Sequence, residues 1–320
     1  MQDDSMYDPE LGEIIAQAFD RLRNQLKEAG PYLHQRISDW MLEYFKTDHP
    51  EEAFKSPQSF PVLLLPWFAE KKLTIQPDAG FQSDLVYSTV NGYCYIRFID
   101  NLMDGHRQQD LKLLPALNFF HTQFQSPYLR YFGCDHPFWE RFTSTWLHSA
   151  EVTLRDAELK EIDFDTFVKV CAQKTTAAKI PLMAVCYRYE SPAQIQDWER
   201  WIDLFGCWHQ MWNDIFDWVK DTRQTTLTYF LSEAERRRKT YEPVVDWVIR
   251  EGFDWGMGLL DSWMLQLKDL AHQVGSPELE LYLVERSKVL ENQKARTFEK
   301  LEELEKLLTT LKRALKVDEI

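Results

Sequence analysis

Hydrophobic residues recur every three or four positions along most of the chain, which is the pattern of helices that bury one face. Residues 1–30 show an acidic start followed by such an amphipathic helix. The apolar positions of this helix are Leu11, Ile14, Ile15, Ala18, Phe19, Leu22 and Leu26. No convincing run of alternating apolar and polar residues indicates a strand. The pattern therefore predicts an all-α protein.

The same periodicity predicts long helices in the rest of the chain. Their expected ranges are 82–104, 111–132, 137–158, 195–221, 241–274 and 279–316. The last of them is highly charged and carries a leucine stripe, which indicates either a cap on the bundle or a contact with a second subunit in a homodimer. The stripe consists of Leu301, Leu304, Leu308, Leu311 and Leu315. No linker or internal repeat divides the chain, so residues 1–320 are expected to form one helical domain.

Composition narrows the classes of partner. The 37 Lys and Arg against 51 Asp and Glu give a net charge of −14, which argues against nucleic acid and against an anionic membrane surface. No apolar run is long enough for a transmembrane helix, and the acidic N-terminus is unlike a signal peptide. The 5 cysteines include no CxxC pair, which fits a reduced, cytoplasmic protein.

Residues 206–221, with the sequence GCWHQMWNDIFDWVKD, carry the strongest candidate chemistry. On a helix, Gln210 and Asn213 fall on the same stripe as Asp217 and Asp221. Oxygen donors one turn apart, with few nearby cations, are typical of a hard-cation site of the kind that Mg2+ prefers. The alternative is an amphipathic surface helix, which the angular pattern alone does not exclude.

Two weaker candidates precede this segment. Arg97, Asp100 and Asp104 share one face at the C-terminal end of an apolar helix, although terminal helix turns are commonly polar. Farther along, Pro181 interrupts an apolar helical pattern just after Lys174 and nearby threonines. A broken helix beside a lysine favours an anion pocket, and a plain loop between two short helices is the alternative.

In order and spacing, these three signals resemble the class I isoprenoid synthases, most closely trans-prenyl diphosphate synthases and class I terpene synthases. The resemblance covers about residues 85–225. Residues 100–104 (DNLMD) are similar to the first aspartate-rich motif, DDxxD, with Asn101 in the second place. The Lys174-Thr175 dipeptide lies where the family's KT pair would be, one helix before the second motif.

The second motif of the family is matched in two ways. Residues 206–217 resemble the prenyl synthase string G-x-x-F-Q-x-x-D-D-x-x-D, with His209 for Phe and Asn213 for the first Asp. Counted from Asn213 in steps of four, the segment instead resembles the terpene synthase metal triad. Asp217 then replaces the usual Ser or Thr, and Asp221 replaces Glu.

The resemblance implies a single large antiparallel helical bundle of the class I terpenoid synthase type, with a central active-site cavity. It also implies several Mg2+ ions between two facing helices, with basic side chains binding the same diphosphate. The residues that it assigns to catalysis and to the metal are Asp100, Asp104, Asn213, Asp217 and Asp221. The residues that it assigns to substrate binding are Arg97, Phe98, Lys174, Thr175, Trp208, Gln210, Trp212, Lys220 and Arg223.

The chain also departs from the chain-elongating synthases. The Gly-Lys-Arg and Arg-Arg-Gly segments that hold their second diphosphate are absent, and Arg107 stands alone after Asp104. We therefore expect a Mg2+-dependent terpene synthase, a carbon–oxygen lyase that ionises one linear prenyl diphosphate. Two alternatives remain: a divergent prenyl transferase with another acceptor, and a non-catalytic helical partner or scaffold.

Overall fold

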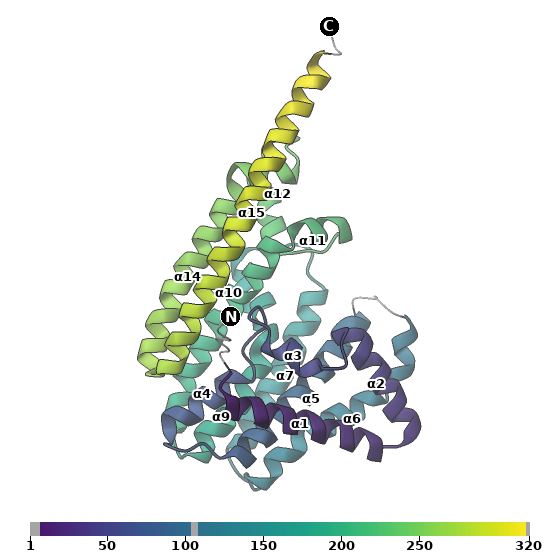
Figure 1. The fold of residues 1–320 in the computed structure, drawn as a ribbon, viewed down its shortest axis with the longest axis vertical. Helices are drawn as coiled ribbons and strands as arrows, with labels where there is room; N and C mark the ends of the chain where they lie inside the picture. Colours follow the sequence, from purple (N-terminus) through teal and green to yellow (C-terminus); the bar gives the residue numbers. More distant parts are fainter. Residues whose placement is uncertain (1–6, 104–107, 318–320) are drawn as a thin grey trace.

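The computed structural model describes residues 7–103 and 108–317, and these ranges contain helices and no strand (Figure 1). The prediction of an all-α protein is thus confirmed for the described chain. The α-helices are α1 (Pro9–Glu28), α2 (Pro31–Phe45), α3 (Pro50–Lys55), α4 (Leu64–Leu73), α5 (Ala79–Met103), α6 (Ala116–Gln125), α7 (Phe138–Ala157), α8 (Phe164–Lys169), α9 (Lys179–Arg188), α10 (Ile195–Phe216), α11 (Trp218–Gln224), α12 (Tyr229–Arg237), α13 (Val244–Trp247), α14 (Phe253–Val274) and α15 (Pro277–Val317). Short 3-10 helices are η1 (Gln108–Leu113), η2 (Ser126–Arg130), η3 (Cys171–Ala178) and η4 (Pro192–Gln194), and η5 (Val248–Gly252) is a π-helix.

Helix α1 forms where the amphipathic pattern predicts it. The Asp8 side chain caps its N-terminus by accepting a hydrogen bond from the Leu11 amide at 2.8 Å, and Pro9 occupies the first turn. All seven apolar positions named from the sequence are buried. They pack the helix against α5, so the N-terminal helix supports the element that carries Asp100.

Helices α5 and α10 each pack extensively on other elements. Helix α5 packs against α1 and α6, and α10 packs against α14 and η3. Both are lined with buried apolar side chains that belong to one hydrophobic core. Because the core fixes both helices, it also fixes the polar residues that they carry.

Prolines and one aspartate divide helices that the periodicity predicts as continuous. The expected helix over 111–132 is split near Pro115 and Pro127, because proline begins a helix more readily than it continues one. Pro181 lies in the first turn of α9, directly after η3. The expected helix over 195–221 is interrupted at Asp217, although the Asp217 amide still donates to the Asn213 carbonyl at 2.8 Å. The polar stripe therefore continues into α11.

Helix α15 runs beside α14 and extends beyond the rest of the bundle (Figure 1). Its start matches the predicted helix over 279–316, and its first half is packed on the core. Of the predicted leucine stripe, Leu311 is 49% exposed, whereas Leu301, Leu304 and Leu308 are partly buried. A contact with a second subunit stays a prediction. No helix of the described chain is both long enough and apolar enough to cross a membrane.

Candidate active site

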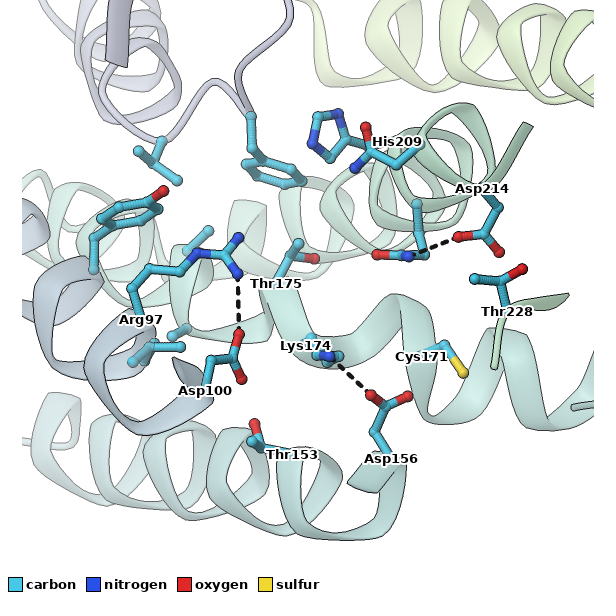
Figure 2. Close-up of a pocket in the computed structure, with 18 of the residues that line it drawn as sticks. Arg97, Asp100, Thr153, Asp156, Cys171, Lys174, Thr175, His209, Asp214 and Thr228 are labelled. Atoms are coloured by element: carbon cyan, nitrogen blue, oxygen red, sulfur yellow. Dashed lines mark hydrogen bonds and ion pairs between the residues drawn. The ribbon is translucent and has the colours of Figure 1, made fainter. Parts of the chain in front are cut away.

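A cavity of about 490 Å³ lies between α5, α7, η3, α10 and the segment that follows α10 (Figure 2). One part of its wall is polar and charged. That part includes Arg97, Asp100, Asp156, Lys174, Thr175, Gln210, Asn213, Asp214, Asp217, Lys220 and Asp221. Segments more than a hundred residues apart in the sequence thus meet around one space.

Most of the site residues predicted from the sequence line this cavity. They are Arg97, Asp100, Lys174, Thr175, Gln210, Asn213, Asp217, Lys220 and Asp221. Arg223 does not line it, nor do the three predicted aromatic residues Phe98, Trp208 and Trp212. Asp104 lies outside the described residues, so the first motif is represented here by Asp100.

The three predicted aromatic residues are buried on other faces of their helices. Phe98 packs edge-on against Trp40, with ring centroids 5.4 Å apart. The ring centroids of Trp208 and Trp212 are 4.7 Å apart, and the guanidinium of Arg286 in α15 lies over both rings. Their neighbours in the sequence reach the cavity because successive side chains on a helix are turned by about 100°.

Lys174 reaches the cavity from η3 and forms an ion pair with Asp156 at 2.8 Å (Figure 2). Burial alone would lower the pKa of Lys174, but the carboxylates of Asp156 and Asp100 raise it above its ordinary value. Asp156 comes from the last turn of α7 and was not predicted as a site residue. Its only sequence signal is the i, i+3 spacing from Thr153, which also lines the cavity.

Among the described residues, the other two cations of the cavity also pair with carboxylates. Nη1 of Arg97 lies 2.9 Å from Oδ2 of Asp100, and Nζ of Lys220 lies 3.6 Å from Oδ2 of Asp217. The Arg97–Asp100 pair lies within one turn of α5, and the Lys220–Asp217 pair lies at the α10–α11 junction. The cavity therefore presents cations that already have a counter-charge.

Asp214 is the second site residue that the sequence argument did not assign. It is buried and accepts hydrogen bonds from Nε2 of Gln210 at 2.9 Å and from the Tyr229 amide at 3.1 Å. Burial raises its pKa to about 7. The carboxyl group thus joins α10 to the start of α12. Its i, i+4 spacing from Gln210 places it on the same face as the stripe, and its place beside Asn213 in the second motif was the available signal.

Oxygen donors of the stripe differ in exposure. Asn213 and Asp217 are exposed, whereas Asp221 is buried and has its pKa raised by burial and by the Asp217 charge. Among the described residues, no group of three or more His, Cys, Asp or Glu side chains is arranged to hold a metal ion. Asn213 of the stripe is an amide and so is not one of these four residue types, and Asp104 lies outside the described residues.

The remaining cavity wall is mainly apolar and includes aromatic rings. It includes Phe60, Val62, Ile96, Phe124, Trp146, Ile162, Ala177, Ala178 and Pro181. Gly92 of α5 lets Phe124 approach, since a Cβ at that position would lie 2.8 Å from the Phe124 ring. The cavity therefore has a charged part and a mainly apolar part.

Comparison with known proteins adds no relative. No family model matches the chain, and no curated protein matches it either.

Proposed function

We propose that the protein is a class I terpene synthase, a Mg2+-dependent lyase that ionises one linear allylic prenyl diphosphate and releases diphosphate. The observation that carries this proposal is the meeting of Asp100, Lys174 and the Asn213–Asp221 stripe around one cavity whose remaining wall is mainly apolar and includes aromatic rings. The volume of about 490 Å³ falls within the usual range of small-molecule sites.

The donor chemistry fits magnesium better than a softer metal. Asn213, Asp217 and Asp221 offer oxygen atoms, as does Asp100 on the facing helix, and magnesium commonly keeps substrate phosphate oxygens among its ligands. A dedicated cluster of protein carboxylates is therefore not required. When bound, the ions supply charge neutralisation to the leaving diphosphate.

The basic side chains of the cavity would bind the same diphosphate. Arg97, Lys174 and Lys220 line the same cavity and can bind diphosphate oxygens in exchange for their carboxylate partners. Once the allylic carbon–oxygen bond breaks, its electron pair stays on the diphosphate. The aromatic wall, including Phe124 and Trp146, excludes water and can stabilise the resulting carbocation through its ring faces.

The test is incubation of the purified protein with C10 to C25 prenyl diphosphates and Mg2+, with assay of diphosphate release and of extracted hydrocarbons. Asn213→Ala and Asp217→Ala should each lower turnover by at least ~10²-fold, because the leaving group loses its positioning. Asp165→Ala is a matched control, since Asp165 forms an exposed ion pair with Lys169 outside the cavity. Near-normal turnover of both stripe variants would contradict the proposal.

The same assay separates the alternatives. A requirement for a second substrate would favour a prenyl transferase with another acceptor. Absence of any Mg2+-dependent diphosphate binding would favour a non-catalytic helical partner.

A further inference from the structure

Arg286 of α15 is a buried cation that needs a physical explanation. Its side chain is 0% exposed, and its Nε and Nη1 groups have no hydrogen-bond partner among the described residues. Arginine is seldom fully buried unless a carboxylate pairs with it, because the charge loses its hydration. Some other interaction must therefore stabilise this guanidinium.

Four aromatic rings surround the guanidinium, and we call them the aromatic box. Its carbon lies 4.6 Å from the ring centroid of Trp212, 5.3 Å from Trp208, 5.7 Å from Phe205 and 6.0 Å from Tyr282. Ring faces attract a cation without neutralising it. The aromatic box therefore explains why Trp208 and Trp212 turn away from the cavity, and it leaves the positive charge of Arg286 intact.

Among the described residues, the guanidinium has its hydrogen-bond contact with His209, which lies between it and the cavity. Nη2 of Arg286 lies 3.4 Å from Nδ1 of His209. The imidazole stacks on Phe205 and meets the edge of Phe60, and it lines the cavity (Figure 2). A guanidinium only donates hydrogen bonds, so Nδ1 must accept and the ring proton must sit on Nε2.

We propose that Arg286 is a positioning residue that fixes His209 as a neutral imidazole with its proton on Nε2, and that this N–H donates to the ester oxygen of the bound diphosphate. The second half of this proposal rests on the proposed function. His209 precedes Asn213 by one helical turn and contacts Phe60, so it lies between the polar stripe and the apolar wall. The ester oxygen of a prenyl diphosphate likewise joins the anionic part of the substrate to its hydrocarbon part.

A neutral donor suits the reaction at this position. When the carbon–oxygen bond breaks, the electron pair stays on the diphosphate oxygen and the Nε2 proton stays on the imidazole, so the hydrogen bond strengthens. A charged imidazolium would instead repel the allylic carbocation. The charged groups acting on His209 are the guanidiniums of Arg286 on α15 and Arg97 on α5, and with burial as the largest cause they lower its pKa to about 3.

The first test is the protonation state of His209 in the intact protein, read from nitrogen-15 imidazole spectra. The His209→Phe variant identifies the signal by its loss. Wild-type protein should show the neutral form with the proton on Nε2, without titration between about pH 5 and pH 8. A proton on Nδ1, or a titration near the ordinary histidine pKa, would overturn the proposal without involving any enzymatic activity.

Variants of Arg286 then test the positioning role. Arg286→Met keeps an apolar side chain within the aromatic box and should raise the pKa of His209 by at least ~1 unit, whereas Arg286→Lys keeps the charge and should hold it low. Arg188→Met is the matched control, because Arg188 also lies over an aromatic ring but does not line the cavity. An unchanged His209 signal in folded Arg286→Met would overturn the positioning role.

The last test joins this proposal to the reaction. Added inorganic diphosphate with Mg2+ should shift the His209 Nε2 signal, and His209→Phe should lower kcat by ~10-fold or more while preserving the fold. In Arg286→Met, kcat/KM should also decrease as the pH falls below the new pKa of His209. A purely structural role would not produce this pH dependence. An unshifted signal in protein that does release diphosphate from a prenyl substrate would overturn the donor role. Failure of the proposed function itself would appear separately, as wild-type protein without diphosphate release.

Discussion

Lys174 forms its ion pair with Asp156, a residue that no motif of the sequence marks. The two side chains are partly exposed to the cavity, at 36% and 22%, and lie 2.8 Å apart. A phosphate that binds Lys174 must displace this carboxylate or approach it closely. Asp156 therefore competes with an anionic ligand for the same ammonium group.

Asp156→Asn should tighten the binding of inorganic diphosphate in the absence of Mg2+ by ~5-fold or more, because one close negative charge is removed. The pKa of Lys174 should fall in the same variant, since Asp156 is the foremost group that raises it. Isothermal titration calorimetry measures the affinity. Asp165→Asn, which removes the partner of the exposed Lys169, should leave affinity unchanged. Weaker binding by Asp156→Asn would show that the carboxylate supports the anion site instead.

Asp214 predicts a pH dependence of stability. Burial raises its pKa from 3.8 to about 7, so the folded protein holds this proton more tightly than the unfolded chain does. The contribution of Asp214 therefore becomes less favourable as the pH rises from about 4 to 7, and its cost is complete above about 7. The free energy of unfolding of Asp214→Asn, relative to that of wild type, should consequently increase by roughly 1–3 kcal/mol from pH 5 to pH 8. Urea unfolding at the two pH values checks this, and a constant difference would refute it.

At the scale of elements, the approach of η3 to α10 decides where Lys174 and Thr175 lie. A Cβ at Gly206 of α10 would stand 2.8 Å from the Ala172 carbonyl oxygen and 2.8 Å from Oγ1 of Thr175. Glycine at this position therefore lets η3 lie directly against α10. The sequence motif contains this glycine, and the packing supplies the reason for it.

Gly206→Ala should displace η3, destabilise the fold by roughly 1–3 kcal/mol and weaken diphosphate binding. Gly258→Ala on α14 is the matched control. It meets no atom within 4 Å, and alanine in a helix interior stabilises by about 0.5–1 kcal/mol. Urea unfolding and calorimetry with inorganic diphosphate and Mg2+ measure the two effects. A Gly206→Ala protein that binds diphosphate as tightly as wild type would show that η3 adapts.

At the scale of the whole molecule, the charge lining the cavity limits what it can hold. Among the described residues the lining cations are Arg97, Lys174 and Lys220, and each is paired with a carboxylate. Two diphosphates side by side would bring several like charges together, and each would need its own basic residues. Under the proposed function, these three cations would serve a single diphosphate.

The protein should therefore not incorporate isopentenyl diphosphate. With an allylic diphosphate, Mg2+ and labelled isopentenyl diphosphate, the organic product should keep the carbon count of the allylic substrate, and the label should stay in the unreacted compound. Chromatography of the extract measures both. Labelled diphosphates of greater chain length would instead support a prenyl transferase.

Local patterns in the sequence are enough to predict an all-α protein and the faces of its helices that pack. Helical periodicity is a local property, so it identifies all seven buried positions of α1 and the long helix α15 without information about contacts. The spacing of polar residues likewise identified the segments that line the cavity, since side chains one turn apart on a helix share a face whatever surrounds it.

Which side chains meet depends on the packing of helices that are distant in the sequence. Trp208 and Trp212 lie within the second motif, yet they pack around Arg286, which comes from a helix more than seventy residues later. Asp156 reaches Lys174 only because α7 packs against η3. Periodicity tells which face of a helix is apolar, but the partner of each face depends on how distant helices pack, and no local pattern contains that information.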